Sequence, residues 1–115
     1  MIAPILSVNF FCTQAGKEPV RDFLKSLPVS DRKAMGADIK TVQYGWPLGM
    51  PLVRKMAPDL WEVRSDIDNG IARVMFTVLN SQMVLLHAFV KKSQKTPANE
   101  LKTAQMRLKQ LRGHT

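Results

Sequence analysis

Residues 60–78, LWEVRSDIDNGIARVMFTV, decide the fold of this chain. Apolar and polar side chains alternate on both sides of the pair Asn69-Gly70, a pattern typical of two antiparallel strands joined by a tight turn. If Asn69 and Gly70 are the two loop residues, Asp66 faces Arg73 across the hairpin. The stretch therefore predicts a hairpin whose register can be counted from its turn.

The alternation gives this predicted hairpin one apolar and one polar face. The apolar side chains, on which we expect helices to pack, are Trp61, Val63, Val74, Phe76 and Val78. The side chains on the opposite face are Glu62, Arg64, Asp66 and Arg73. In this register Arg64 and Arg73 are diagonal neighbours on one exposed face.

Two interpretations of the arginine pair stay open. Guanidinium groups held close on a rigid sheet repel one another unless an anion lies between them, and each can donate two hydrogen bonds to a phosphate. Alternatively, Asp66 and Glu62 neutralise both arginines in ordinary cross-strand ion pairs. The pairing alone does not choose between a phosphate site and a structural cluster.

Helical and strand patterns outside the hairpin complete an α+β fold. Apolar residues at helical spacing predict a helix over 18–27, a second helix capped by Ser30 and stopped at Gly45, and a third capped by Thr96 with Pro97 at its first position. Strands are expected over 1–11, 52–56, 60–67, 71–79 and 83–90. The order βααββββα predicts a RelE-like arrangement, a twisted antiparallel sheet of four to five strands with the helices on one face.

The loop after residue 79 has two acceptable lengths. A two-residue loop, Asn80-Ser81, sends His87 and Phe89 into the core. A loop that also includes Gln82 leaves them on the face of the sheet that carries Arg64 and Arg73, here called the arginine face. We favour the longer loop because it buries four apolar side chains and no histidine. It places Leu85, His87, Phe89 and Lys91 beside the arginines and Val84, Leu86, Ala88 and Val90 in the core.

The chain is short and strongly basic. Its 115 residues suffice for one domain, expected over 1–115, and its formal charge of +8 favours a polyanionic partner. From Lys91 onward seven Lys or Arg residues stand against one acid, Glu100, so this part carries +6 of the charge. The lone Cys12 and the lack of spaced Cys or His ligands favour a reducing cytoplasm and no bound metal. No apolar run has the length of a membrane-spanning helix, so we expect a soluble, cytoplasmic protein without a membrane partner.

Four segments together resemble the RelE/HigB superfamily of toxins, and within it the phage Gp49-like branch. The most specific is LLHAFVKKSQKTP, residues 85–97, in which a strand is followed by a Lys-Lys pair and a Thr-Pro helix start. The other segments are PVRDFL at 19–24, LWEVR at 60–64 and ARV at 72–74. The resemblance supports the fold expected from the order of elements.

The resemblance implies the toxin of a type II toxin–antitoxin system, a ribosome-dependent mRNA endonuclease. Such an enzyme cleaves the codon in the ribosomal A site without metal or other cofactor, by activating a ribose 2′-OH to attack the adjacent phosphodiester. The reaction needs a base for the 2′-OH proton, cations for the phosphorane and an acid for the leaving 5′-oxygen. The implied partners are mRNA on the ribosome, ribosomal RNA and a HigA-like helix-turn-helix antitoxin, with DNA contacted only through the antitoxin complex.

By position, the resemblance places Arg64 and Arg73 on the scissile phosphate. Lys91 or Lys92 would assist in charge neutralisation or proton transfer. His87 has a suitable intrinsic pKa for the base, and the choice between it and the lysines stays open. The residues expected to bind RNA are Arg54, Lys55, Phe89, which would stack on a base, and Lys95.

Two other functions compete with the nuclease. The same fold is compatible with a non-catalytic basic module that binds RNA or DNA, and with a phage-derived regulatory protein that inhibits a host protein. Neither predicts new mRNA ends within codons, whereas the nuclease does.

Overall fold

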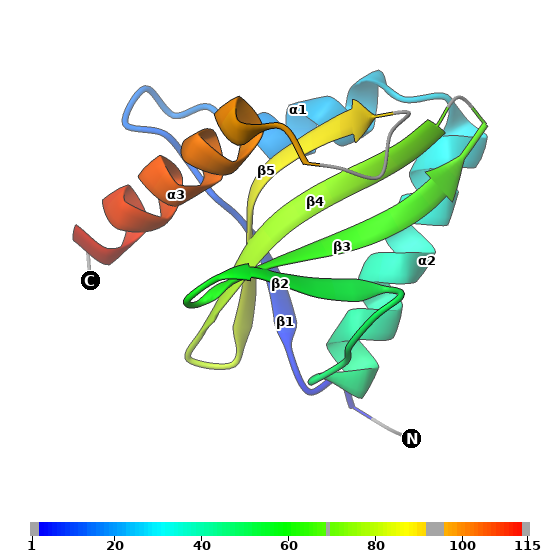
Figure 1. Cartoon of the computed structure of the whole chain (residues 1–115), viewed down its shortest axis with the longest axis horizontal. Helices are drawn as coiled ribbons and strands as arrows, with labels where there is room; N and C mark the ends of the chain where they lie inside the picture. Colours follow the sequence, from blue (N-terminus) through cyan, green and yellow to red (C-terminus); the bar gives the residue numbers. More distant parts are fainter. Residues whose placement is uncertain (1–2, 69, 92–95, 114–115) are drawn as a thin grey trace.

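The computed structural model describes residues 3–68, 70–91 and 96–113, which form a five-stranded sheet and three helices (Figure 1). The strands are β1 (Ser7–Phe10), β2 (Val53–Ala57), β3 (Leu60–Ile67), β4 (Gly70–Leu79) and β5 (Gln82–Lys91). The helices are α1 (Pro19–Ser26), α2 (Val29–Gly45) and α3 (Ala98–Gly113). This is the predicted α+β order, βααββββα.

The sheet is mixed rather than wholly antiparallel. Its strand order is β1-β5-β4-β3-β2, and the pairings from β2 to β5 are antiparallel as predicted. β1 pairs with β5 in parallel, and it is shorter than the strand expected over residues 1–11. The β3–β4 hairpin therefore lies inside the sheet, with a neighbouring strand on each side.

Helices cover both faces of the sheet, and not one face as predicted (Figure 1). α1 and α2 pack on the predicted apolar face, where Val20, Met35, Ile39 and Val42 of these helices join Val63, Val74 and Phe76. α3 packs on the other face, where Ala104 and Leu108 join Leu60, Met75 and Phe89. An apolar stripe shows that a helix has a buried side, but it does not show which face of a sheet that side contacts. The expected polar face is therefore partly covered.

The register of the β3–β4 hairpin differs from the predicted one by two residues. Ile67 pairs with Gly70, so Gly70 belongs to β4 instead of the loop. Because side chains alternate with a period of two, this shift leaves every side chain on its predicted face. It brings Arg64 directly opposite Arg73, where the count from the turn made them diagonal neighbours.

The β4–β5 hairpin has the shorter of the two loops. Leu79 pairs with Gln82, so the loop consists of Asn80 and Ser81, and the preference for three residues was wrong. Both loop residues have positive φ, 51° and 62°, as a type I′ turn requires. This turn matches the right-handed twist of the two strands, which is why it overrides the burial argument.

A β-bulge at Leu86 then changes which side chains share a face. Leu85 and His87 pair with successive residues of β4, so the strand gains one residue between them. His87 and Phe89 consequently lie on the arginine face, as predicted, but the bulge places them there and not a three-residue loop. Leu85 lies in the core instead, while Val84 and Leu86 are buried under α3.

Two predicted helix caps are not formed. α2 begins at Val29, which places Ser30 inside its first turn, and no side chain caps this helix. Thr96 lies before α3, and the carbonyl of Pro97 accepts the N–H of Leu101 in the first helical hydrogen bond. The Thr96 hydroxyl is used elsewhere, in the site described next.

Candidate functional site

Residues predicted to act on RNA lie in three rows across β3, β4 and β5, on the face that α3 partly covers. The register pairings define these rows as Asp66–Ile71–Lys91, Arg64–Arg73–Phe89 and Glu62–Met75–His87. Rows lie about 7 Å apart along the strands, because same-face residues are two positions apart. The sheet therefore brings Arg64, Arg73, His87, Phe89 and Lys91 together, as the sequence predicted.

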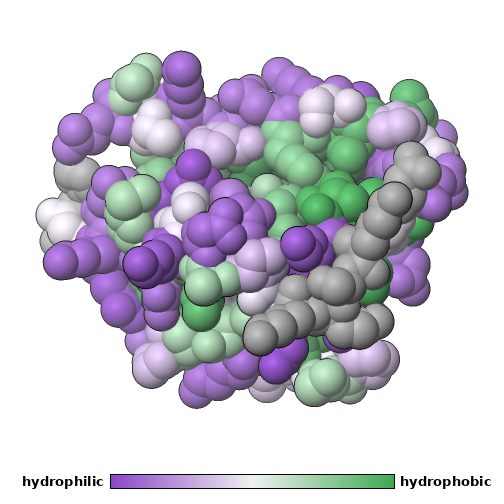
Figure 2. Space-filling model, turned by 45° about the horizontal axis from the view of Figure 1, so that its top comes forward, coloured by the Kyte–Doolittle hydropathy of each residue, from purple (hydrophilic) through white to green (hydrophobic). Residues whose placement is uncertain are grey.

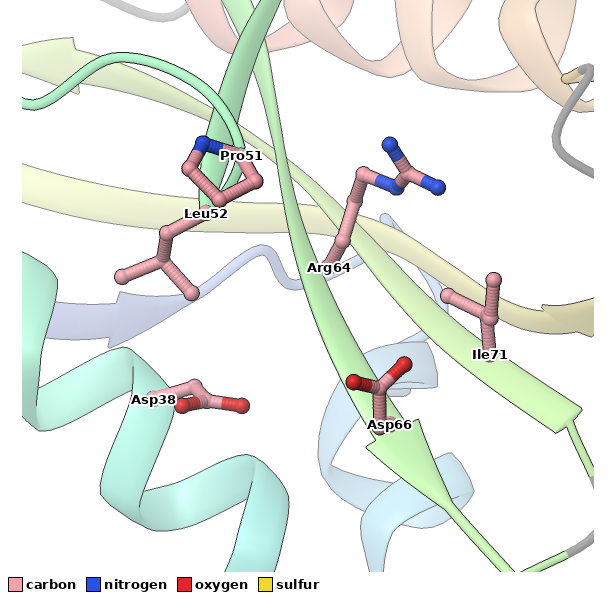
Figure 3. Close-up of a pocket in the computed structure, with 6 residues that line it drawn as sticks. All are labelled: Asp38, Pro51, Leu52, Arg64, Asp66 and Ile71. Atoms are coloured by element: carbon pink, nitrogen blue, oxygen red, sulfur yellow. The ribbon is translucent and has the colours of Figure 1, made fainter.

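Arg64 lies at a hollow in the surface. Its side chain is partly exposed. The hollow measures about 500 Å³ and is lined by Asp38, Pro51, Leu52, Arg64, Asp66 and Ile71 (Figure 3). In Figure 3 the guanidinium group extends away from the strand at one end of this hollow, and the two aspartates lie at the other. This arrangement leaves Arg64 at a surface that an anionic ligand can reach.

Arg73, in contrast, is fully buried and already paired. Its Nη1 donates to Oε1 of Glu62 at 3.1 Å and to Oγ1 of Thr96 at 3.0 Å, and the Thr96 hydroxyl donates to Oε2 of Glu62 at 2.9 Å. Both charged side chains are 0% exposed. The expected direct contact between Arg73 and a phosphate does not match this geometry. The geometry matches the alternative, a cross-strand ion pair, in which the partner of Arg73 is Glu62 and not Asp66.

The Glu62–Arg73–Thr96 network joins three parts of the chain. Glu62 belongs to β3 and Arg73 to β4, while Thr96 directly precedes Pro97 at the start of α3. A buried ion pair is tolerated when further hydrogen bonds satisfy it, and the Thr96 hydroxyl contacts both partners. The network therefore fixes the start of α3 on the sheet. Sequence reasoning placed Glu62 on this face but missed the role of Thr96, whose type and position are equally typical of a helix cap.

His87 is held between two side chains of α3. Its Nε2 lies 3.3 Å from Oε1 of Glu100, and its Nδ1 lies 3.2 Å from Nη1 of Arg107, which also donates to the carbonyl of Leu86 at 2.9 Å. Because a guanidinium group only donates, Nδ1 is the acceptor and Nε2 carries the proton. Burial lowers the pKa of His87, and Arg107 lowers it slightly further, while Glu100 acts in the opposite direction. His87 is therefore neutral here, with both ring nitrogens engaged.

Phe89 and the lysines of this face occupy different environments. The Phe89 side chain is 8% exposed and stacks on His87, with ring centroids 5.7 Å apart, so its ring is not presented to an RNA base as predicted. Lys91 is half-buried, opposite Ile71. The predicted site residues Lys92 and Lys95 lie outside the described residues.

The two basic residues of β2 point to opposite faces. Arg54 is exposed and pairs with Glu62, which places it on the same face as Arg64. Lys55 is also exposed but pairs with Trp61, a residue of the other face. Of the two, only Arg54 is placed to extend the basic surface around the hollow.

Acidic residues of α2 contribute contacts that the sequence analysis missed. Oδ2 of Asp38 accepts the Ser65 hydroxyl at 2.5 Å, and Oδ1 of Asp31 accepts the N–H of Asp68 at 3.3 Å. Both therefore attach α2 to β3 and its turn. Their spacing of seven residues places them on one side of the helix, the side of the buried Met35. In the sequence, two acidic residues on the apolar side of a predicted helix were the signal that could have indicated these contacts.

One face of the molecule is largely hydrophilic (Figure 2). Hydrophilic residues cover much of this face, and the largest group of hydrophobic residues lies toward its upper right. The outward side of α3 adds exposed cations, among them Lys102, Lys109 and Arg112. Within the described ranges no helix is long and apolar enough to cross a membrane, and no three His, Cys, Asp or Glu side chains are grouped as metal ligands.

The fold and the site define a small α+β protein with a basic sheet surface and an arginine at a surface hollow. Comparison with protein families identifies it further. The chain belongs to the phage-derived Gp49-like family (DUF891), which matches residues 22–109 and is the RelE/HigB-type toxin family. This confirms the resemblance drawn from the sequence. Among curated proteins, none matches the chain.

Proposed function

We propose that this chain is the toxin of a type II toxin–antitoxin system and that it cleaves mRNA in the ribosomal A site, independently of metal. Family membership supports the coarser part of this proposal, a toxin of a toxin–antitoxin system. The observation that carries the catalytic part is Arg64, a partly exposed arginine on a rigid strand at the edge of a hollow. A net charge of +8 suits a protein that binds ribosomal RNA and mRNA.

In the proposed reaction the ribose 2′-oxygen attacks the neighbouring phosphorus and the bond to the 5′-oxygen breaks. A 2′,3′-cyclic phosphate and a 5′-hydroxyl result. Arg64 binds the scissile phosphate and stabilises the extra negative charge of the phosphorane, because its fork can donate two hydrogen bonds to phosphate oxygens. Lys91 and Lys92 remain our proposed groups for charge neutralisation and for both proton transfers, in which one takes the proton of the 2′-OH and the other protonates the leaving 5′-oxygen.

For Arg73 and His87 we propose supporting roles. Arg73 lies directly opposite Arg64 on the neighbouring strand and acts through Glu62 and Thr96, which hold β3, β4 and α3 in one arrangement. His87 has no ring nitrogen directed to the hollow, so it positions α3 through Glu100 and Arg107 instead of serving as the base. Both residues then affect activity by keeping the surface around Arg64 in place.

A non-catalytic RNA-binding module is the second candidate. The burial of Arg73 favours it, because one of the two arginines expected on the phosphate is already neutralised. Such a module binds ribosomal RNA through the same basic surface and leaves mRNA intact.

In the cell, the toxin additionally requires a neutralising antitoxin, which we expect to be a helix-turn-helix protein encoded beside it.

Controlled expression of the chain in a bacterial host tests the proposal. We expect growth arrest together with new mRNA 5′ ends that map within codons of translated messages. Arg64→Ala should relieve the arrest and remove these ends, while Lys33→Ala, which changes an exposed lysine on α2, should retain both. Growth arrest with intact mRNA would favour the binding module instead.

A further inference from the structure

We infer that the hollow beside Arg64 is a nucleobase-binding site that prefers guanine. The inference rests on the proposed function, since it concerns the RNA nucleotide whose phosphate Arg64 binds. It adds a recognition role for Asp38 and Asp66, two residues with no part in the cleavage chemistry described above.

The hollow combines two carboxylates with one guanidinium group (Figure 3). Asp38 reaches it from α2 and Asp66 from β3, and both carboxylates lie at the end away from the Arg64 guanidinium. Asp38 uses Oδ2 to accept the Ser65 hydroxyl. The Asp66 side chain is exposed and makes no hydrogen bond or ion pair within the described ranges. The site thus needs a ligand that donates hydrogen bonds at one end and carries an anion at the other.

The edge of β3 adds a backbone donor and acceptor to the same place. Backbone groups of alternate residues in a strand point to the same side. The N–H of Arg64 donates to the carbonyl of Leu52 at 3.0 Å, so the N–H and C=O of Asp66 are directed toward that side as well. The β2 pairing ends at Val53, so no described strand residue pairs with Asp66 there. The edge of β3 is therefore open at Asp66.

The remaining walls suit a flat ring. Pro51, Leu52 and Ile71 line the hollow with apolar surface. A volume of about 500 Å³ lies within the range of small-ligand sites, which combine apolar walls with a few placed polar groups. Single-stranded RNA is commonly recognised in this way, with the base stacked on side chains and its Watson–Crick edge hydrogen-bonded.

Guanine matches these groups better than the other bases. Its N1–H and N2 amino group lie side by side and can both donate to one carboxylate, and its O6 can accept the N–H of Asp66. Uracil presents two carbonyl oxygens and one N–H, so a carboxylate faces acceptors on either side of a single donor. Asp66 and Arg64 are two residues apart on one face of β3, about 7 Å, a separation that one nucleotide can span from base to phosphate.

Titration of the 115-residue chain with GMP, AMP, CMP and UMP tests the inference without any cleavage step. We expect GMP to bind about tenfold more tightly than UMP and to shift the amide NMR signals of Asp66 and Ile71. Asp66→Asn should abolish the preference, because it replaces a carboxylate that accepts two hydrogen bonds with an amide. Arg64→Ala should weaken all four nucleotides alike, and Lys33→Ala should change none.

Two results would overturn the inference. One is equal affinity for the four nucleotides with no effect of Asp66→Asn, which would leave a phosphate site alone. The other is no binding of any nucleotide at millimolar concentration. Asp38→Asn is the second variant, because it changes the other carboxylate that lines the hollow. The mapped mRNA ends distinguish this inference from the proposed nuclease function. Ends that map within codons but show no enrichment of guanine at the cleaved codons would support cleavage and reject the base site.

Discussion

Replacing Glu62 by glutamine should destabilise the protein strongly, because it leaves a buried positive charge without its counter-ion. Glu62 and Arg73 are both 0% exposed, and their closest atoms are 3.1 Å apart. Removing one partner of a buried ion pair costs about 3–5 kcal/mol. Domains of this size unfold with about 5–15 kcal/mol, so the variant should lose a large part of its stability. Thr96 also loses the carboxylate that accepts its hydroxyl proton.

Urea denaturation followed by far-UV circular dichroism measures this cost. The matched control is Asp59→Asn, which breaks the exposed pair between Asp59 and Arg112 and should cost less than about 1 kcal/mol. The double variant Glu62→Met/Arg73→Met should recover most of the loss, because it removes both charges from the interior. If Glu62→Gln cost no more than Asp59→Asn, the buried network would not hold the sheet and α3 as we describe.

Three further predictions concern α3, the β4–β5 turn and RNA binding. Since burial lowers the pKa of His87, the unfolded chain takes up a proton that the folded chain resists, so the free energy of unfolding should fall as pH drops below about 6.5. His87→Gln should remove this pH dependence, and an unchanged profile would contradict the placement of His87. Ser81→Gly should stabilise the protein by about 0.5–1 kcal/mol, because Ser81 holds a φ of 62° that strains L-residues; a loss of stability in urea would argue against the turn. The pair of substitutions Lys102→Gln and Lys109→Gln should lower the salt dependence of ribosomal RNA binding by about two units of log–log slope, and an unaltered slope would exclude this side of α3 from the interface.

The β3–β4 hairpin could be predicted because its information is local. The alternation of side chains assigns each residue to a face, and an error of two residues in register leaves that assignment intact. The pairing of Arg64 with Arg73, instead of their diagonal placement, needed the structure. So did the bulge at Leu86, which has no turn-forming residue to mark it and which decides the environment of His87.

The candidate site was harder to predict because α3 changes it. The sequence analysis placed all the helices on the apolar face of the sheet, whereas Ala104 and Leu108 bury α3 against the predicted RNA-binding face. This contact explains why Arg73 is internal and why Phe89 is not presented to solvent. Asp38 was missed because it comes from α2, and no sequence pattern relates a helix residue to the edge of a distant strand.

Cleavage of a defined mRNA on purified ribosomes tests the central claim most directly. The chain would be added to ribosomes stalled with a known codon in the A site, and the ends of the mRNA would be mapped. We predict a cut within that codon, with a 2′,3′-cyclic phosphate on the upstream product, and a loss of rate of about 100-fold or more in Arg64→Ala. Intact mRNA with the wild-type protein bound to ribosomes, or equal cleavage by Arg64→Ala, would contradict the account.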